Sequence, residues 1–162
     1  MNRNWWYCVE LVCLTILGCS SLPSSEARHK KPELTAKKAA GPGPKDADAP
    51  TKFTQTHSGL RYRILRKSTD HQPSSWDTVV CHYRGWLDDG TEFDSSYKRS
   101  QPTTFPLQGV IAAWTEGVQL IGEGGMIELE VPSDLGYGAN GHPPTIPPNA
   151  RLHFIIELVK VK

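Results

Sequence analysis

The residue types that most often perform chemistry are spread along this sequence without the spacing that catalytic or metal-binding motifs require. Its six histidines are scattered, with no zinc-ligand spacing, and there is no phosphate-binding P-loop, G-x-S-x-G or C-x-x-C motif. We therefore expect neither a bound metal nor a cofactor. A reaction at this protein would have to proceed without a nucleophile, which points to non-covalent chemistry.

Three blocks in the second half of the chain are distinctive because aromatic residues, an aspartate and several glycines recur in them. They are residues 80–96 (VCHYRGWLDDGTEFDSS), 109–118 (GVIAAWTEGV) and 137–150 (YGANGHPPTIPPNA). Taken singly, such aromatic residues indicate a hydrophobic core, and an acid beside a turn indicates a cap for a backbone N–H. The order and spacing of all three blocks together identify a protein family far more specifically than any of these residues does alone.

Together the blocks resemble the FKBP family, the macrolide-binding immunophilins that are peptidyl-prolyl cis/trans isomerases. The resemblance runs from about residue 60 to residue 161. It implies a twisted antiparallel sheet wrapped around one short helix, a proline-containing polypeptide as substrate, and no cofactor. Rotation about an X–Pro bond suits a site without a nucleophile, because its barrier of about 18–20 kcal/mol comes from amide resonance and no bond is cleaved.

The same resemblance implies the residues of a binding pocket. The catalytic set would be Tyr83, Phe93, Asp94, Ile111, Trp114, Tyr137 and Phe154, and the substrate-binding set would be Val110, Arg99, His142 and Ile146. Trp114 would be the floor under the proline ring. The Ile111 N–H and the Tyr137 hydroxyl would donate hydrogen bonds to substrate carbonyls, and Arg99 would hold Asp94.

Two threonines depart from the family pattern. Thr103 stands where many relatives have an aromatic wall residue, and Thr145 stands where a branched aliphatic residue is common. Both substitutions make the rim of the pocket smaller and more polar. We therefore expect isomerase activity to be retained while macrolide inhibitors bind with reduced affinity.

A scaffold for these residues follows from hydrophobic periodicity. Strand patterns cover residues 60–65, 77–83, 126–131 and 151–161, with shorter extended segments at 91–94 and 104–107. Helical spacing predicts one short helix over 110–120. We expect Glu128 and Glu130 to face solvent and Cys81 to be a buried thiol. The fold class is therefore α+β, with a twisted antiparallel β-sheet of about five strands wrapped around one short α-helix.

The first 19 residues have the features of a bacterial export signal. A basic start precedes a mostly apolar run over residues 5–17, which is too short for a typical membrane span. The run ends at Ile16-Leu17-Gly18-Cys19, which resembles the lipobox of bacterial lipoproteins, although Glu10 departs from the pattern. We predict a lipoprotein signal peptide at 1–18 and lipidation of Cys19; the alternatives are an uncleaved anchor and a plain buried segment.

Residues 19–52 are rich in Pro, Ala, Ser, Gly and Lys and almost lack aromatic and β-branched residues. Such a segment buries too little apolar surface to offset the entropy of ordering. We therefore predict a lipidated cysteine with a disordered tether over 19–52 and an FKBP-type isomerase domain over 53–162. The formal net charge of the chain is only +1, so no nucleic-acid partner is expected.

The predicted protein is a monomeric, lipid-anchored isomerase that accelerates protein folding in the bacterial cell envelope. It would face the periplasm, and the outer membrane is preferred because Ser20, rather than an aspartate, follows Cys19. The alternative is a chaperone or binding module with the FKBP fold and little isomerase activity. The complete aromatic pocket set favours the enzyme.

Overall fold

The computed structural model describes residues 41–162, and the fold is given for these residues. The predictions for residues 1–40, which include the signal peptide, Cys19 and most of the tether, lie outside the described residues. Within residues 41–162, no helix is both long and apolar enough to cross a membrane.

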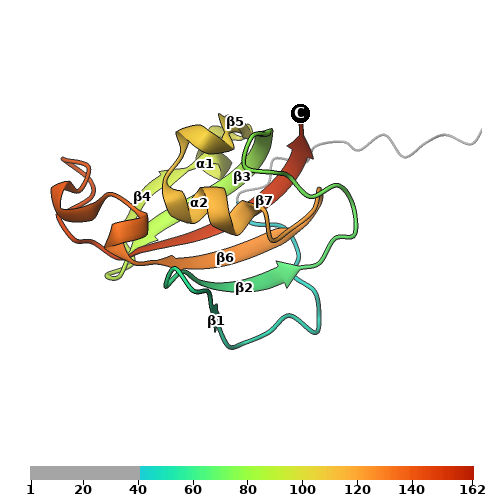
Figure 1. Cartoon of the computed structure of the whole chain (residues 1–162), viewed down its shortest axis with the longest axis horizontal. Helices are drawn as coiled ribbons and strands as arrows, with labels where there is room; N and C mark the ends of the chain where they lie inside the picture. The colour runs from blue at the N-terminus through green and yellow to red at the C-terminus, as the bar shows by residue number, and fades with distance from the viewer. Residues whose placement is uncertain (1–40) are drawn as a thin grey trace, which may run out of the picture. The chain divides into compact units, whose positions relative to one another are not determined.

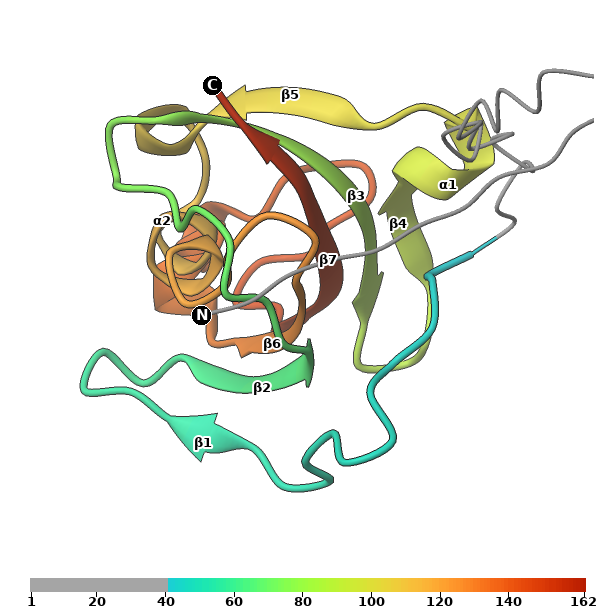
Figure 2. The same ribbon diagram turned by 90° about the vertical axis from the view of Figure 1, so that its right-hand side faces the viewer.

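One antiparallel sheet dominates the described residues (Figure 1). Its strands are β1 (Thr54–Gln55), β2 (Arg61–Arg66), β3 (Thr78–Leu87), β4 (Glu92–Ser95), β5 (Thr103–Pro106), β6 (Met126–Val131) and β7 (Leu152–Val161). The strand order is β1-β2-β6-β7-β3-β4, and β5 pairs with β3 beside this path. The sheet curves around helix α2 (Ala112–Val118), which Figure 2 shows nearly end-on.

The predicted α+β class is confirmed. The sheet has seven strands rather than about five, because β1 joins one edge and the short segments β4 and β5 pair with β3. A four-residue helix, α1 (Ser96–Arg99), and three 3₁₀-helices, η1 (Leu107–Gly109), η2 (Ser133–Leu135) and η3 (Gly138–Asn140), were not predicted. They are too short to produce a hydrophobic period.

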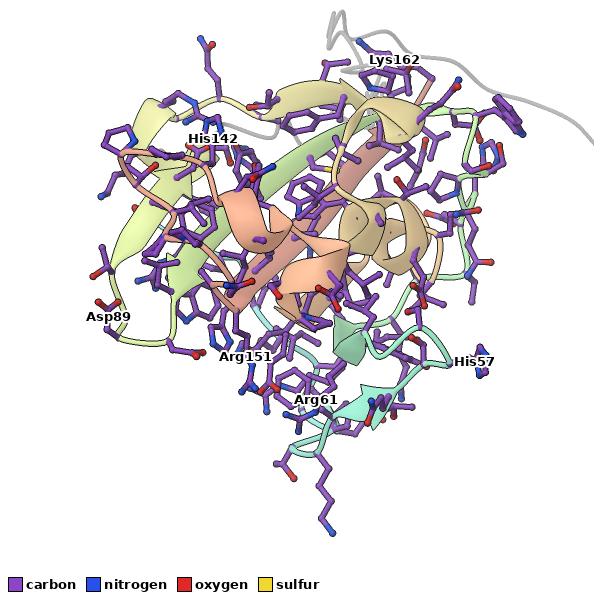
Figure 3. The ribbon with its side chains drawn as sticks, turned by 60° about the vertical axis from the view of Figure 1, so that its left-hand side comes forward. His57, Arg61, Asp89, His142, Arg151 and Lys162 are labelled. Carbon is purple, nitrogen blue, oxygen red and sulfur yellow. The ribbon has the colours of Figure 1, made fainter. Side chains whose placement is uncertain are left out.

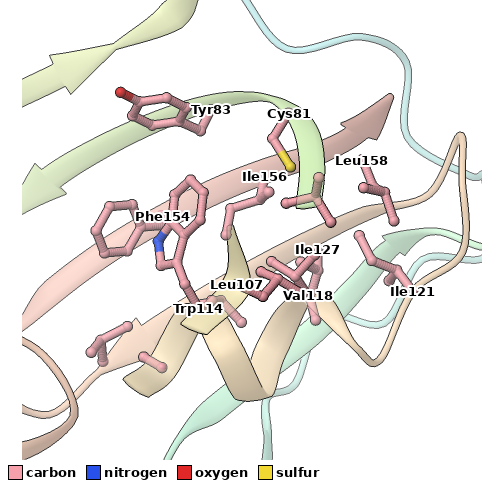
Figure 4. Close-up of a cluster of buried hydrophobic side chains, with 14 of the residues drawn as sticks. Cys81, Tyr83, Leu107, Trp114, Val118, Ile121, Ile127, Phe154, Ile156 and Leu158 are labelled. Carbon is pink, nitrogen blue, oxygen red and sulfur yellow. The ribbon is translucent and has the colours of Figure 1, made fainter. Parts of the chain in front are cut away.

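The hydrophobic core fills the space between α2 and the concave face of the sheet (Figure 4). Trp114 and Val118 lie on one side of α2, and they meet Ile127 from β6 and Ile156 from β7. Cys81 is fully buried, as predicted, and burial raises the pKa of its thiol to about 12.

The outer face of the sheet carries ion pairs that follow the strand register. Arg61 is opposite Glu130 and Arg63 is opposite Glu128, and each pair forms a salt bridge. Glu128 was expected to face solvent; it does lie on the outer face, but it is only 9% exposed. The Arg63 side chain covers it and donates a hydrogen bond at 2.8 Å.

Residues 41–53 form a strap across this outer face, shown as the cyan segment in Figure 2. The Gly43 N–H donates to Glu157 at 2.8 Å, Arg66 donates to the Pro44 carbonyl at 3.0 Å, and the Asp46 N–H donates to the Leu65 carbonyl at 2.8 Å. Residues 41–52 belong to the predicted tether, and this part of it is hydrogen-bonded to the sheet. Disorder was predicted because this segment can bury little apolar surface. Its contacts with the sheet are instead hydrogen bonds made by backbone and charged groups.

A matched pair of truncations in β7 tests this core. Ile156 is fully buried, whereas Val159 on the same strand is 46% exposed. Ile156→Ala should lower the free energy of unfolding by about 2–5 kcal/mol because it leaves a cavity. Val159→Ala should change it by no more than about 0.5 kcal/mol. Urea denaturation measures both, and equal losses would contradict the assigned core.

Candidate active site

A cavity of about 580 Å³ opens beside the N-terminal end of α2, bounded by β3, β4, β5, β7 and the loop from Tyr137 to Ile146. Its lining residues are Tyr83, Phe93, Asp94, Phe105, Gly109, Val110, Ile111, Trp114, Tyr137, His142, Thr145, Ile146 and Phe154. The structure thus brings together all the residues predicted for the pocket except Arg99. Figure 3 shows the loop that carries His142. The catalytic roles of these residues stay predictions.

Trp114 forms the floor of the cavity, with three other rings standing edge-on around it. Its ring centroid lies 5.1 Å from Tyr83, 5.3 Å from Phe105 and 5.5 Å from Phe154, at interplanar angles of 74–86°. Such edge-to-face packing is the favoured arrangement of aromatic pairs. Three of these rings, Tyr83, Trp114 and Phe154, are drawn in Figure 4. The walls and floor therefore support one another.

Gly85 on β3 allows two walls of the cavity to meet. The Phe93 ring packs edge-on against Phe154, with centroids 5.5 Å apart. A Cβ atom at Gly85 would lie 2.6 Å from Phe93 and 2.8 Å from Phe154, which is far closer than real contacts allow. Glycine at this position is therefore required for the aromatic wall.

Asp94 is held at the edge of the cavity by two donors. The Tyr83 hydroxyl donates to one carboxylate oxygen, and Arg99 forms a 2.5 Å salt bridge with the other. Arg99 also donates to the Tyr83 hydroxyl at 2.8 Å. Arg99 does not line the cavity, so its predicted substrate-binding role is not supported by its position; its contacts are with Asp94 and Tyr83.

The charges of this group differ from those of free side chains. Burial raises the pKa of Asp94, but the hydrogen bonds from Tyr83 and Arg99 outweigh it, and the pKa is lowered overall. Burial, followed by the hydrogen bond to Asp94, raises the pKa of Tyr83 to about 12. At neutral pH, Asp94 is therefore ionised and Tyr83 is a protonated donor.

Several donors at the cavity have no acceptor among residues 41–162, and two of them are placed to bind a carbonyl. These two are the Ile111 N–H, just before α2, and the Tyr137 hydroxyl. The Tyr137 ring stacks on His142 with centroids 5.3 Å apart. Burial, and then the charge of Asp94, raises the pKa of Tyr137, so its phenol stays protonated. Both groups can donate to a bound carbonyl.

Sequence reasoning missed Phe105 as a wall. Thr103 was noted as the place of a lost aromatic residue, but Thr103 does not line the cavity, whereas Phe105 does. The two residues lie on one face of β5, since side chains alternate along a strand. Phe105 could have been identified from the sequence, because it is an aromatic residue two positions after Thr103 and therefore on the same face of the strand.

Neither metal nor nucleotide motifs mark this site. Within the part of the chain that the structure describes, no group of three or more His, Cys, Asp or Glu side chains could hold a metal ion. Residues 136–141 (GYGANG) have the spacing of a dinucleotide fingerprint. They follow the 3₁₀-helix η2 and contain η3 instead of forming a turn from a strand into a helix, so they lack the context that this fingerprint needs.

The fold, the aromatic cavity and the hydrogen-bonded group of Asp94, Tyr83 and Arg99 (the Asp94 cluster) agree with one class of protein. Residues 69–159 match the family model described as FKBP-type peptidyl-prolyl cis-trans isomerase. The chain belongs to this family. The resemblance inferred from the three sequence blocks is thereby confirmed.

Curated relatives and solved structures give the same result. The chain is 42% identical over 140 residues to "FKBP-type peptidyl-prolyl cis-trans isomerase FkpA" of Escherichia coli K12, covering 86% of this chain and 51% of that protein. It is 44% identical over 105 residues to "Peptidyl-prolyl cis-trans isomerase Mip" of Coxiella burnetii, covering 65% of this chain and 46% of the relative. The crystal structure of FkpA from Escherichia coli superposes with a TM-score of 0.67 at 44% identity, covering 70% of this chain and 53% of that chain. The chain thus spans about half the length of these relatives.

The pH dependence of stability tests the Asp94 cluster. Because the folded pKa of Asp94 lies below its usual value of 3.8, its contribution to stability is present above that value. The contribution is lost as the pH falls through the lowered folded pKa. We expect Asp94→Asn to be less stable than the wild type above about pH 5, and the gap to close on acidification. Urea denaturation across this range measures the gap, and a gap that does not vary with pH would contradict the assignment.

Proposed function

We propose that this protein catalyses cis/trans isomerisation of X–Pro bonds in polypeptides. The observation that carries the proposal is an aromatic cavity with Trp114 as its floor and two donors, the Ile111 N–H and the Tyr137 hydroxyl, that are free to bind carbonyls. The same functional description in the names of relatives at 42–44% identity supports it.

The cavity can lower the barrier without a covalent step. The planar amide is the charge-separated form, so an apolar site disfavours it relative to the twisted amide. The two donors can form hydrogen bonds that fit the twisted amide better than the planar amide. Such bonds would stabilise the transition state more than the bound substrate, and so raise the rate. A reduction of the barrier by about 5–8 kcal/mol would accelerate rotation by roughly four to six orders of magnitude.

The location of the protein is the second part of the proposal. We infer that Cys19 is acylated and becomes the first mature residue once residues 1–18 are removed. It would then hold the domain at the bacterial cell envelope, on the periplasmic side and by preference at the outer membrane. The lipobox-like residues 16–19 support this, and the curated relatives compared above are bacterial proteins.

Reduced affinity for macrolides is also proposed. Thr145 lines the cavity, which supports a smaller and more polar rim. Thr103 does not support it, because Phe105 supplies an aromatic wall on that side of the cavity. The proposal therefore depends on the Thr145 side of the rim.

Tyr137→Phe tests the reaction with a single hydroxyl. Losing one net hydrogen bond worth about 0.5–1.5 kcal/mol should lower kcat/KM for an X–Pro peptide roughly two- to ten-fold in a protease-coupled assay. Tyr62→Phe removes a hydroxyl from β2, outside the cavity, and should leave the rate unchanged. Wild-type protein that is inactive yet suppresses aggregation would favour the chaperone alternative instead.

Mass spectrometry of protein isolated from bacterial membranes tests the anchor. We expect a mature N-terminus at Cys19 that carries acyl chains, since several chains give durable binding where one gives only marginal binding. Cys19→Ser should remain unacylated and be released into the soluble fraction. An intact, unmodified N-terminus in the wild type would overturn the anchor.

A further inference from the structure

A buried polar cluster lies behind Tyr83 and is not used by the proposed reaction. Ser96 is fully buried and Tyr97 is 5% exposed, although both carry hydroxyl groups. They open helix α1, which follows β4 directly and ends at Arg99. Buried hydroxyls are normally hydrogen-bonded, because leaving them unpaired is costly. Their partners therefore indicate what they hold in place.

The Ser96 hydroxyl extends the β3–β4 ladder by one position. The last regular pair at this end joins Arg84 to Ser95. The next residue on β3 is Tyr83, whose N–H donates to the Ser96 Oγ at 2.8 Å. The same Oγ lies 3.3 Å from the Tyr83 carbonyl oxygen. The Ser96 hydroxyl thus hydrogen-bonds to both the N–H and the carbonyl of Tyr83, at the position where β4 no longer pairs with β3.

His82 connects this hydroxyl to the rest of α1. Its Nδ1 lies 3.0 Å from the Ser96 Oγ, and its ring stacks on Tyr97 with centroids 5.1 Å apart. The Tyr97 hydroxyl in turn donates to Glu157 on β7 at 2.5 Å. A helix of only four residues is therefore fixed to β3 through Ser96 and to β7 through Tyr97.

These contacts bear on the cavity because Tyr83 and Arg99 are the donors that hold the Asp94 carboxylate. Ser96 fixes the backbone from which the Tyr83 phenol projects. It also fixes the first turn of the helix from which Arg99 projects. Movement of either element would change the geometry of both donors at once.

We propose that Ser96 is a positioning residue, whose hydroxyl, supported by His82, holds Tyr83 and α1 so that Asp94 keeps its orientation at the cavity. Ser96 does not line the cavity and therefore acts only through these neighbours. The effect on catalysis rests on the proposed isomerase function. The effect on Asp94 does not, so the two can be tested separately.

The test compares Ser96→Ala with Ser95→Ala in the full chain. Ser95 is the adjacent buried serine, and its hydroxyl makes no hydrogen bond within residues 41–162. Carbon-detected NMR titration of the Asp94 carboxyl reports on folded molecules alone. Ser96→Ala should move the Asp94 midpoint up toward the ordinary value of 3.8, and Ser95→Ala should leave it in place. The kcat for an X–Pro peptide should fall on the order of five-fold in Ser96→Ala, with little change in KM.

A second pair covers the case in which Ser96→Ala does not fold. Ser96→Thr and Ser96→Val have the same shape, but only threonine keeps the hydroxyl. The threonine variant should retain the wild-type Asp94 midpoint and the valine variant should not. An Asp94 midpoint that is the same with and without the hydroxyl would overturn the proposal. A shifted midpoint in a protein without isomerase activity would leave the positioning role standing and reject the proposed function.

Discussion

The meeting of Phe93 and Phe154 over Gly85 is the packing constraint on which the site depends. Side chains alternate along β3, so Gly85 lies on the same face as Cys81 and Tyr83, toward α2. With no side chain at Gly85, a ring from β4 and a ring from β7 pack edge-on above it. Trp114 packs against that same Phe154 ring, so a residue larger than glycine would disturb the floor as well as the wall.

The negative charge of Asp94 lies at the edge of this aromatic surface and needs partners that stabilise it there. A lone carboxylate beside these aromatic rings would tend to take up a proton, because burial disfavours its charged form. Arg99 and the Tyr83 hydroxyl keep Asp94 ionised by pairing with its two oxygens. Each carboxylate oxygen thus has a fixed donor, so the charge is held at the edge of the cavity. The remaining surface can stay dry enough to favour a twisted amide over a planar one.

Long patterned segments were predictable from the sequence, and short or polar ones were not. β6 begins and ends at the predicted residues, because alternation over six positions is a strong signal. Phe105 was missed because its strand is only four residues long and the family pattern drew attention to Thr103. The strap was missed because its order comes from groups distant in sequence, such as Glu157, which accepts from the Gly43 N–H. No local pattern contains that information.

The strap also decides from which side the chain enters the domain. Glu157 lies between Ile156 and Leu158 on β7, and those two side chains are buried in the core, so Glu157 must point to the opposite face. The strap is bonded to Glu157 and to Arg66 on that outer face, whereas α2 and the cavity occupy the concave face. Residues 41–53 therefore reach the sheet without crossing the cavity. The proposed polypeptide substrate could therefore approach the aromatic floor without displacing the segment that leads into the domain.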